Sequence, residues 1–243
     1  RRVLRVSLEL GGKNPLVVLG DADIEKALEW VLLSAFSNAG QRCAAASRLI
    51  IEESIYDNFI SRFIEKTRKL KIGVEDDCAL GPVVNARQLE KILKAIEGAS
   101  SQGAQILTGG RRMNQKGFFL EPTVISGVKM DALISQGELF GPVICAYRAK
   151  DFQEALGMAN QSSYGLTASI HTKDLDKAFA FAGQVKCGTC SINGGTYGSE
   201  PHLPFGGLKL SGNGTREPGP EAIDLYSNLK TISLNIDMER ING

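Results

Sequence analysis

Apolar and polar positions along the chain follow two different periods. Short apolar runs, typical of buried strands, occupy residues 14–20, 46–53, 104–110, 141–149, 165–172 and 187–193. Apolar positions spaced three and four apart, typical of helices, occupy residues 21–40, 54–70, 85–103, 151–161 and 174–185. Near-continuous apolar strands separated by helices indicate a parallel sheet that is covered on both faces. The pattern therefore predicts an α/β fold in which helices flank both faces of a parallel sheet.

The sequence also marks the ends of the first helix and one long loop. Asp21 or Asp23 can cap this helix, Glu25 lies in its first turn, and Gly40 ends it. Residues 194–219 form a long stretch rich in Gly and Pro. Loops of that length inside a compact domain are usually functional, and ligands of parallel sheets bind beyond the carboxyl ends of the strands. We therefore expect a site at the carboxyl ends of the strands, with residues 194–219 taking part.

The N-terminal segment has the period of a strand. Every second residue from Leu4 to Leu10 is apolar and the residues between them are polar, as in a half-buried strand. The sequence begins without Met and without the apolar stretch of a signal peptide. Because it begins inside this strand, we expect it to be a piece of a longer protein.

Composition and charge exclude some classes of partner. Of the 243 residues 43% are hydrophobic and 23% charged, as in ordinary soluble globular proteins. The 28 Lys and Arg residues nearly balance the 27 Asp and Glu residues, leaving a formal net charge of +1. A balanced charge favours neither nucleic acid nor an anionic membrane as partner. The apolar runs are also too short to span a membrane.

The cysteines indicate a reducing compartment. There are five of them, an odd number, widely scattered in a chain large enough to bury its own core. This use of cysteine favours free thiols and a cytoplasmic protein over a disulfide framework. Cys187 and Cys190 form a C-x-x-C pattern within a predicted strand, where residues three apart point to opposite faces. We therefore expect neither a metal site nor a redox pair there.

Four short stretches carry candidate chemistry. They are LELGGKNP (8–15), NAGQRCAAASR (38–48), GELFGPV (137–143) and PFGGLKLSGNGTRE (204–217). Cys43 alone would more often be a packed small hydrophobe than a nucleophile. Together and in this order, however, the four stretches closely resemble the aldehyde dehydrogenase superfamily over essentially the whole chain. The resemblance implies oxidation of an aldehyde to a carboxylate with NAD or NADP.

The resemblance assigns Cys43 as the nucleophile and Glu9 as the general base. A thiolate that attacks an aldehyde forms a tetrahedral thiohemiacetal, whose oxyanion needs hydrogen-bond donors. If a helical turn begins at Cys43, its free N–H groups would supply donors and lower the pKa of the thiol. Glu9 would activate the water that hydrolyses the thioester, with its pKa raised by burial beside Leu8 and Leu10. The alternative for Glu9 is a solvated side chain at a strand edge.

Cofactor contacts are implied at a second group of residues. In the resembling family, residues at the positions of Glu138 and Phe140 hold the nicotinamide ribose and flank the ring, and the contacts extend to Leu10 and Gly11. Many relatives carry a second acidic residue where this chain has Gly137, and glycine makes the loop less rigid.

Substrate contacts are implied at Asn193 and Phe205, which match positions near the substrate tunnel. Asn at a strand end also commonly serves turn chemistry, so both interpretations of Asn193 stay open. Neither His171 nor His202 lies in a nucleophile or zinc-binding pattern, and no metal site is expected.

The resemblance also divides the chain. Residues 1–10 would be the last strand of a cofactor-binding domain, 11–226 the catalytic domain, and 227–243 an oligomerisation strand that pairs protomers into a homodimer or homotetramer. The family's Gly-rich turn, which grips the dinucleotide, and the Asn side chain that completes the oxyanion site would precede residue 1. Two alternatives therefore remain for these 243 residues: a binding or structural module without dehydrogenase activity, and a cofactor-free thiol esterase.

Overall fold

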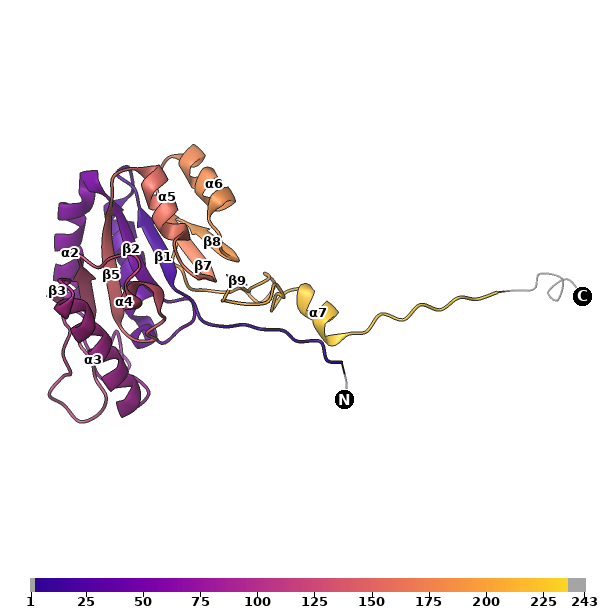
Figure 1. Ribbon diagram of the computed structural model, residues 1–243, viewed down its shortest axis with the longest axis horizontal. Helices are drawn as coiled ribbons and strands as arrows, with labels where there is room; N and C mark the ends of the chain where they lie inside the picture. The colour runs from indigo at the N-terminus through magenta and orange to yellow at the C-terminus, as the bar shows by residue number, and fades with distance from the viewer. Residues whose placement is uncertain (1–2, 236–243) are drawn as a thin grey trace, which may run out of the picture.

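The computed structural model describes residues 3–235 and is built around a seven-stranded sheet (Figure 1). The strand order is β3-β4-β5-β2-β1-β7-β8. These strands are β1 (Asn14–Val18), β2 (Ala46–Glu52), β3 (Gln105–Thr108), β4 (Thr123–Ser126), β5 (Val143–Ala149), β7 (Thr167–His171) and β8 (Thr189–Ile192). All neighbouring pairs are parallel except β3 and β4, which are antiparallel. The predicted α/β fold is confirmed, with one antiparallel edge strand.

Five helices of nine or more residues cover the sheet. They are α1 (Ile24–Phe36), α2 (Tyr56–Arg68), α3 (Ala86–Ser101), α5 (Phe152–Asn160) and α6 (Leu175–Gln184). Asp23, Asn85, Asp151 and Asp174 cap α1, α3, α5 and α6, each accepting a hydrogen bond from a backbone N–H in the first turn. Asp21 instead accepts hydrogen bonds at the start of α6.

The helices form one layer on each face of the sheet, because the strands bury side chains on both sides. In β1, Leu16 and Val18 pack into the core formed with α1 and α2. Val17, which points to the opposite face, packs into the core formed with α3, α5 and α6. This arrangement confirms the expected helical cover on both faces and explains why the strands read as continuous apolar runs.

Short elements escaped the sequence analysis. They are β4, α4 (Leu133–Gln136), α7 (Glu221–Tyr226), the 3-10 turns Ser37–Gly40 and Glu53–Ile55, and a small sheet of β6 (Tyr164–Gly165) and β9 (Leu208–Lys209). Segments of two to six residues contain too few positions to establish a period. Their conformation depends on the neighbours that they pair with.

The N-terminal segment does not form the strand that its alternating pattern predicts. Residues 3–10 form no strand, and their only bridge joins Glu9 to Gly212. The segment runs beside residues 211–215, with the N–H of Leu10 donating to the carbonyl of Ser211 at 3.1 Å. An alternating pattern does not make a strand unless a partner strand supplies a full ladder of hydrogen bonds. Leu8 and Leu10 are correspondingly exposed rather than packed around Glu9.

The C-terminal tail lies apart from the sheet in this single chain, and its pairing with another protomer stays a prediction. Residues 227–235 belong to no sheet, and Leu229, Ile232 and Leu234 are exposed. Figure 1 shows this segment, in yellow, extending away from the body of the molecule. The remainder of the predicted strand, residue 236 and beyond, lies outside the described residues. Among the described residues, no helix is both long and apolar enough to cross a membrane.

Candidate active site

The segments that enter three adjacent strands meet at one edge of the sheet. Gly12 lies just before β1, Cys43 just before β2, and Glu138 shortly before β5. Because β5, β2 and β1 are neighbours and parallel, their amino ends lie side by side. The candidate site is therefore at the amino ends of these strands, and the expected position at the carboxyl ends is wrong. Three segments distant in the sequence are brought together by strand order alone.

Cys43 lies in a tight connection rather than at the start of a helix. Helix α1 ends at Phe36, and Asn38 and Ala39 adopt positive φ angles of 53° and 54° that reverse the chain. Strand β2 begins three residues after Cys43. No helical turn starts at the thiol, so the expected helix terminus is absent.

Two buried side chains hold the connection around Cys43. The side-chain amide of Asn14 donates to the carbonyl oxygens of Cys43 at 2.7 Å and of Ala45 at 2.9 Å. The Thr196 hydroxyl donates to the carbonyl oxygen of Ala44 at 2.7 Å. The carbonyls of Cys43 and of the two residues after it are thus all committed to hydrogen bonds. Thr196 belongs to the 194–219 loop, so this loop contacts the candidate site.

Glu138 packs against the glycine pair of the first motif. Its Oε1 accepts a hydrogen bond from the N–H of Gly12 at 3.0 Å. A Cβ atom at Gly11 would overlap the Glu138 carboxylate, and one at Gly12 would lie 2.5 Å from the carbonyl oxygen of Cys43. The sequence Gly11-Gly12 is therefore required for the close approach of the Glu138 and Cys43 segments.

Glu9 faces the same site from the N-terminal segment. Its Oε1 lies close to Gly206, where a Cβ atom would be 2.6 Å away. Burial raises the pKa of Glu9, the nearby Glu217 carboxylate raises it further, and Arg216 opposes both. The raised pKa agrees with expectation, but Glu217 contributes to it in place of the exposed Leu8 and Leu10. A carboxyl group with a raised pKa is better suited to accept a proton near neutral pH.

The thiol of Cys43 has a raised pKa, contrary to the expected lowering. Burial is the largest cause, and the carboxylates of Glu138 and Glu9 add to it. The backbone N–H groups of Ala44 and Cys43 act in the opposite direction, as donors to the sulfur. These hydrogen bonds favour the thiolate, but the loss of hydration outweighs them. The same effects show that Cys43, Glu138 and Glu9 lie within electrostatic reach of one another.

Phe140 presents its ring at the edge of the site. It has a positive φ of 58° and the residue is 40% exposed. The side-chain amide of Gln88 donates to the carbonyl oxygen of Phe140 at 3.0 Å and holds the backbone in this strained conformation. A narrow cleft lies between Phe140, Glu138 and the residues around Cys43.

Asn193 and Phe205 are placed by backbone pairing. The Asn193 side chain accepts from the N–H of Thr172 at 2.9 Å and donates to its carbonyl oxygen at 2.9 Å. Asn193 thus serves the strand end, with φ of 55°. Phe205 exchanges backbone hydrogen bonds with Glu217 and adjoins Gly206, beside Glu9. No hydrogen bond joins Asn193 to the Cys43 segment within the described chain.

Several site residues were missed in the sequence analysis. Asn14, Gly12 and Lys13 lie in the quoted LELGGKNP motif but received no role, and Thr196 and Glu217 lie in the long loop. Lys13 is buried, and loss of hydration lowers its pKa to about 8. The quoted motifs were the available signal for Asn14 and Glu217, whereas nothing local marks Thr196.

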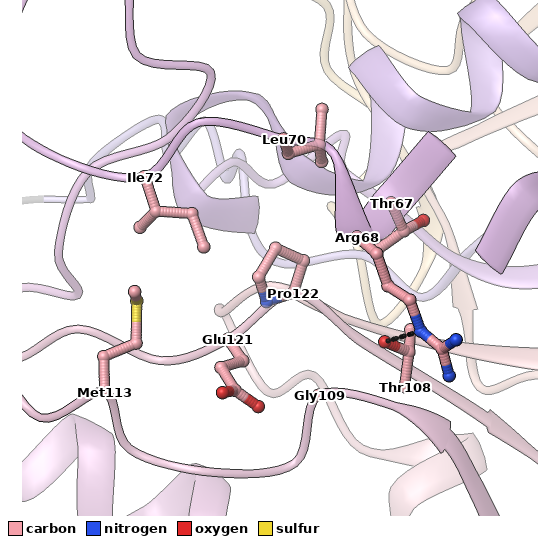
Figure 2. Close-up of a pocket in the computed structure, with 9 residues that line it drawn as sticks. All are labelled: Thr67, Arg68, Leu70, Ile72, Thr108, Gly109, Met113, Glu121 and Pro122. Carbon is pink, nitrogen blue, oxygen red and sulfur yellow. Dashed lines mark hydrogen bonds between the residues drawn. The ribbon is translucent and has the colours of Figure 1, made fainter. Parts of the chain in front are cut away.

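A larger hollow lies elsewhere on the molecule. It has a volume of about 340 Å³ and is lined by the end of α2 and the segments around β3 and β4. Figure 2 shows Arg68 turned toward Thr108, with Glu121 on the opposite wall. The Arg68 guanidinium is engaged with Thr108 Oγ1 and the carbonyl of Leu107. The hollow contains neither Cys43 nor Glu9, so its size does not make it the candidate active site.

No three His, Cys, Asp or Glu side chains are grouped to hold a metal ion in residues 3–235. The chemistry on hand is a thiol, two carboxyl groups of raised pKa and a set of backbone N–H donors.

Known proteins are similar to this chain in sequence and in fold. The family model for the aldehyde dehydrogenase family matches residues 1–232. An aldehyde dehydrogenase of Davidiella tassiana is 42% identical, over 96% of this chain and 47% of its own length. The cytosolic aldehyde dehydrogenase 1 of Rattus norvegicus is 41% identical, over 97% of this chain and 47% of its own length. The chain thus spans about half the length of these curated relatives.

Solved structures of aldehyde dehydrogenases have a fold similar to that of this chain. Betaine aldehyde dehydrogenase of Staphylococcus aureus in complex with NAD+ superposes with a TM-score of 0.88 at 38% identity, covering 91% of this chain and 45% of that one. HpcC of Thermus thermophilus superposes with a TM-score of 0.90 at 39% identity, covering 95% of this chain and 46% of that one. With the family model matching nearly the whole chain, and relatives and structures agreeing with it, the chain belongs to the aldehyde dehydrogenase family.

Proposed function

We propose that the protein containing this chain oxidises an aldehyde to a carboxylate with NAD or NADP, using Cys43 as nucleophile and Glu9 as general base. The observation that carries the proposal is the convergence of Cys43, Glu9 and Glu138 at one edge of the sheet, where both carboxylates perturb the pKa of the thiol. Membership of the family supports the reaction class.

The first step is attack of the Cys43 thiolate on the aldehyde carbonyl carbon, which forms a C–S bond and places negative charge on oxygen. The backbone N–H groups at Cys43 and Ala44 favour the thiolate and would donate to this oxygen. The hydrogen bonds from Asn14 and Thr196 keep the connection fixed, so that the donors need no rearrangement as charge develops.

The cofactor would be held by Glu138 and Phe140. Oε1 of Glu138 is engaged by Gly12, and Oε2 accepts no hydrogen bond from the described residues, so one carboxylate oxygen is available to a ribose hydroxyl. The exposed ring of Phe140 offers a flat apolar surface beside it. These features fit a nicotinamide nucleotide, which when bound supplies the acceptor for hydride. Gly11 and Leu10 form the adjoining wall.

Glu9 then removes a proton from water, which attacks the thioester carbon and releases the carboxylate and the Cys43 thiol. The raised pKa of Glu9 suits this role. Family members that transfer the acyl group to coenzyme A typically lack this base, so its presence favours hydrolysis. Phe205, one residue from Gly206, is proposed to contact substrate. For Asn193 the structure favours the turn interpretation.

The test uses the full-length protein and its Cys43→Ser and Glu9→Gln variants. Cofactor-dependent oxidation of an aldehyde panel should vanish in Cys43→Ser. In Glu9→Gln we expect one rapid equivalent of reduced cofactor per site followed by slow turnover, because acylation needs no water activation. Cys78→Ser, in an exposed loop, is the matched control and should retain full activity. Activity that survives Cys43→Ser would refute the proposal.

The two alternative functions, a module without dehydrogenase activity and a thiol esterase, can be tested on the 243-residue chain itself. A module without dehydrogenase activity should leave NADH fluorescence unchanged, and micromolar binding would exclude it. A thiol esterase should cleave p-nitrophenyl esters until Cys43 is alkylated. Absence of any cleavage would remove the esterase.

We also propose assembly as a homodimer or homotetramer through residues 227–243. The exposed apolar side chains of Leu229, Ile232 and Leu234 favour burial against another protomer, whose strand edge the segment could join. Light scattering before and after deletion of 227–243 tests this, since an unchanged mass would exclude the tail. We further propose that the protein is cytoplasmic, because free thiols are typical of a reducing compartment.

A further inference from the structure

Cys187 and Cys190 lie together, contrary to the expectation from strand geometry. Cys187 occupies a bend before β8, whereas Cys190 is inside the strand and pairs with Ala168. Opposite-face alternation holds only within a strand, so it does not separate this pair. The Cys187 thiol folds back and donates a hydrogen bond to the carbonyl oxygen of Thr189 at 3.1 Å. This places its sulfur against the peptide group that leads directly into Cys190.

The backbone of this bend is held firmly. The N–H of Gly188 donates to the carbonyl oxygens of Gly165 at 3.1 Å and Leu166 at 3.0 Å, and the N–H of Thr189 also donates to Leu166 at 3.1 Å. Both cysteines are partly buried and pack against the core formed with α3, α5 and α6. The two thiols are therefore kept adjacent without losing all contact with solvent.

The thiols differ in acidity because they are hydrogen-bonded to each other. A hydrogen bond between the two thiols lowers the pKa of Cys190 despite its burial. The same hydrogen bond, together with burial, raises the pKa of Cys187. A thiol of lowered pKa beside a thiol of raised pKa is the arrangement that reacts with peroxides and then closes a disulfide.

We propose that Cys187 and Cys190 form a redox site, separate from Cys43, that hydrogen peroxide converts to a reversible intrachain disulfide. The Cys190 thiolate attacks one peroxide oxygen, the O–O bond breaks, and water leaves after protonation, giving a sulfenic acid. The Cys187 sulfur then attacks the Cys190 sulfur, and the S–O bond breaks to release a second water. The two sulfurs lose two electrons, which reduce one peroxide to two waters. A dithiol such as dithiothreitol reverses the reaction.

The positions of the tryptic cleavage sites allow one peptide to report on both cysteines. Trypsin cuts after Lys186 and Lys209, so residues 187–209 form one peptide that contains both cysteines and none of the other three. The full-length protein is treated with hydrogen peroxide, quenched with iodoacetamide without reduction, digested and analysed by mass spectrometry. We expect this peptide to lose two hydrogens and carry no alkyl group, and to take two alkyl groups after dithiothreitol.

Variants separate the site from general oxidation. Cys187→Ser and Cys190→Ser should each abolish the bridged peptide, while Cys43→Ser and Cys78→Ser should leave it unchanged. In Cys187→Ser, a sulfenic acid on Cys190 should be trapped by dimedone. The proposal is overturned if peptide 187–209 remains doubly alkylated, gains only sulfinic or sulfonic oxygens, or bridges to another cysteine peptide. Because the experiment measures peptide mass, its outcome does not depend on dehydrogenase activity.

Discussion

Asn14 and Cys43 are joined by a hydrogen bond of 2.7 Å from the side-chain amide of Asn14 to the carbonyl oxygen of Cys43. The same amide group accepts from the N–H of Thr167 at 3.1 Å through its oxygen. Asn14 thus ties the Cys43 segment to β1 and β7 at once, and it is itself 1% exposed. Its role is positioning: it sets where the sulfur and the neighbouring N–H groups lie.

Replacing Asn14 by Asp should therefore impair Cys43 without touching substrate. The carboxylate cannot donate to the two carbonyls and repels them, so kcat should fall by about 10- to 100-fold, as expected for a small misplacement of reacting groups. The rate of Cys43 alkylation by iodoacetamide should fall as well. Asn58→Asp, on the exposed face of α2, is the control. An unchanged alkylation rate in a folded Asn14→Asp variant would contradict the positioning role.

The pH dependence of Cys43 alkylation should reveal its raised pKa. Burial and the nearby carboxylates disfavour the thiolate, so the midpoint should lie above that of an ordinary cysteine, about 8.5. Glu138→Gln removes one negative charge and should move the midpoint to lower pH; Glu9→Gln should do the same to a smaller extent, following the order of the two effects. Glu75→Gln, whose carboxylate contacts Cys78, should leave Cys43 unaffected. A midpoint that rises in Glu138→Gln would be inconsistent with this electrostatic account.

Gly11→Ala should loosen the proposed cofactor site. The new Cβ would overlap the Glu138 carboxylate, which must move away from its bond to Gly12. We expect KM for the cofactor to rise at least about tenfold, the effect of losing roughly 1.4 kcal/mol of binding free energy. Gly98→Ala, in the last turn of α3 with nothing within 4 Å of the new Cβ, is the matched control. It should raise the free energy of unfolding by about 0.5–1 kcal/mol and leave KM alone.

Arg48 should be essential to stability. Its guanidinium is buried and donates to the carbonyls of Lys13 at 2.9 Å, Met158 at 2.8 Å and Ala159 at 2.9 Å. The last two belong to the C-terminal turn of α5, where a cation is favourable. Arg48→Met leaves these acceptors unpaired and should lower the free energy of unfolding by about 2–4 kcal/mol. Urea titration measures this, beside Arg112→Met on the exposed surface, where we expect less than about 0.5 kcal/mol.

His171 should make the fold acid-sensitive. Burial lowers its pKa to about 4 from an ordinary 6.5, so the unfolded state takes up a proton first as the pH falls. The neutral His171 makes its full contribution to the free energy of unfolding above about pH 6.5. This contribution is lost progressively as the pH falls to about 4, and the total loss is no more than about 3 kcal/mol. His171→Gln should flatten stability over this range relative to the native protein. An equal slope in both would show that other groups account for the acid sensitivity.

Local patterns were sufficient for much of the fold. The alternation of apolar runs with helical periods correctly placed β1, β2, β5, β7 and β8 and the five longer helices, because burial on one or two faces imposes a repeat that each segment carries by itself. The motif around Cys43 and the glycine pair before β1 likewise identified the segments of the candidate site. How these segments act together cannot be predicted from the local sequence of any one of them.

Tertiary structure decided the position and the electrostatics of the site. The neighbouring order of β1, β2 and β5 places Gly12, Cys43 and Glu138 at the amino edge, and strand order depends on contacts between distant segments. The sign of the Cys43 pKa shift depends on how much water the assembled walls remove, a quantity that no short window contains. Whether residues 3–10 pair as a strand depends on a partner, and whether Cys187 meets Cys190 depends on where β8 begins. In each case the deciding atoms belong to another part of the chain.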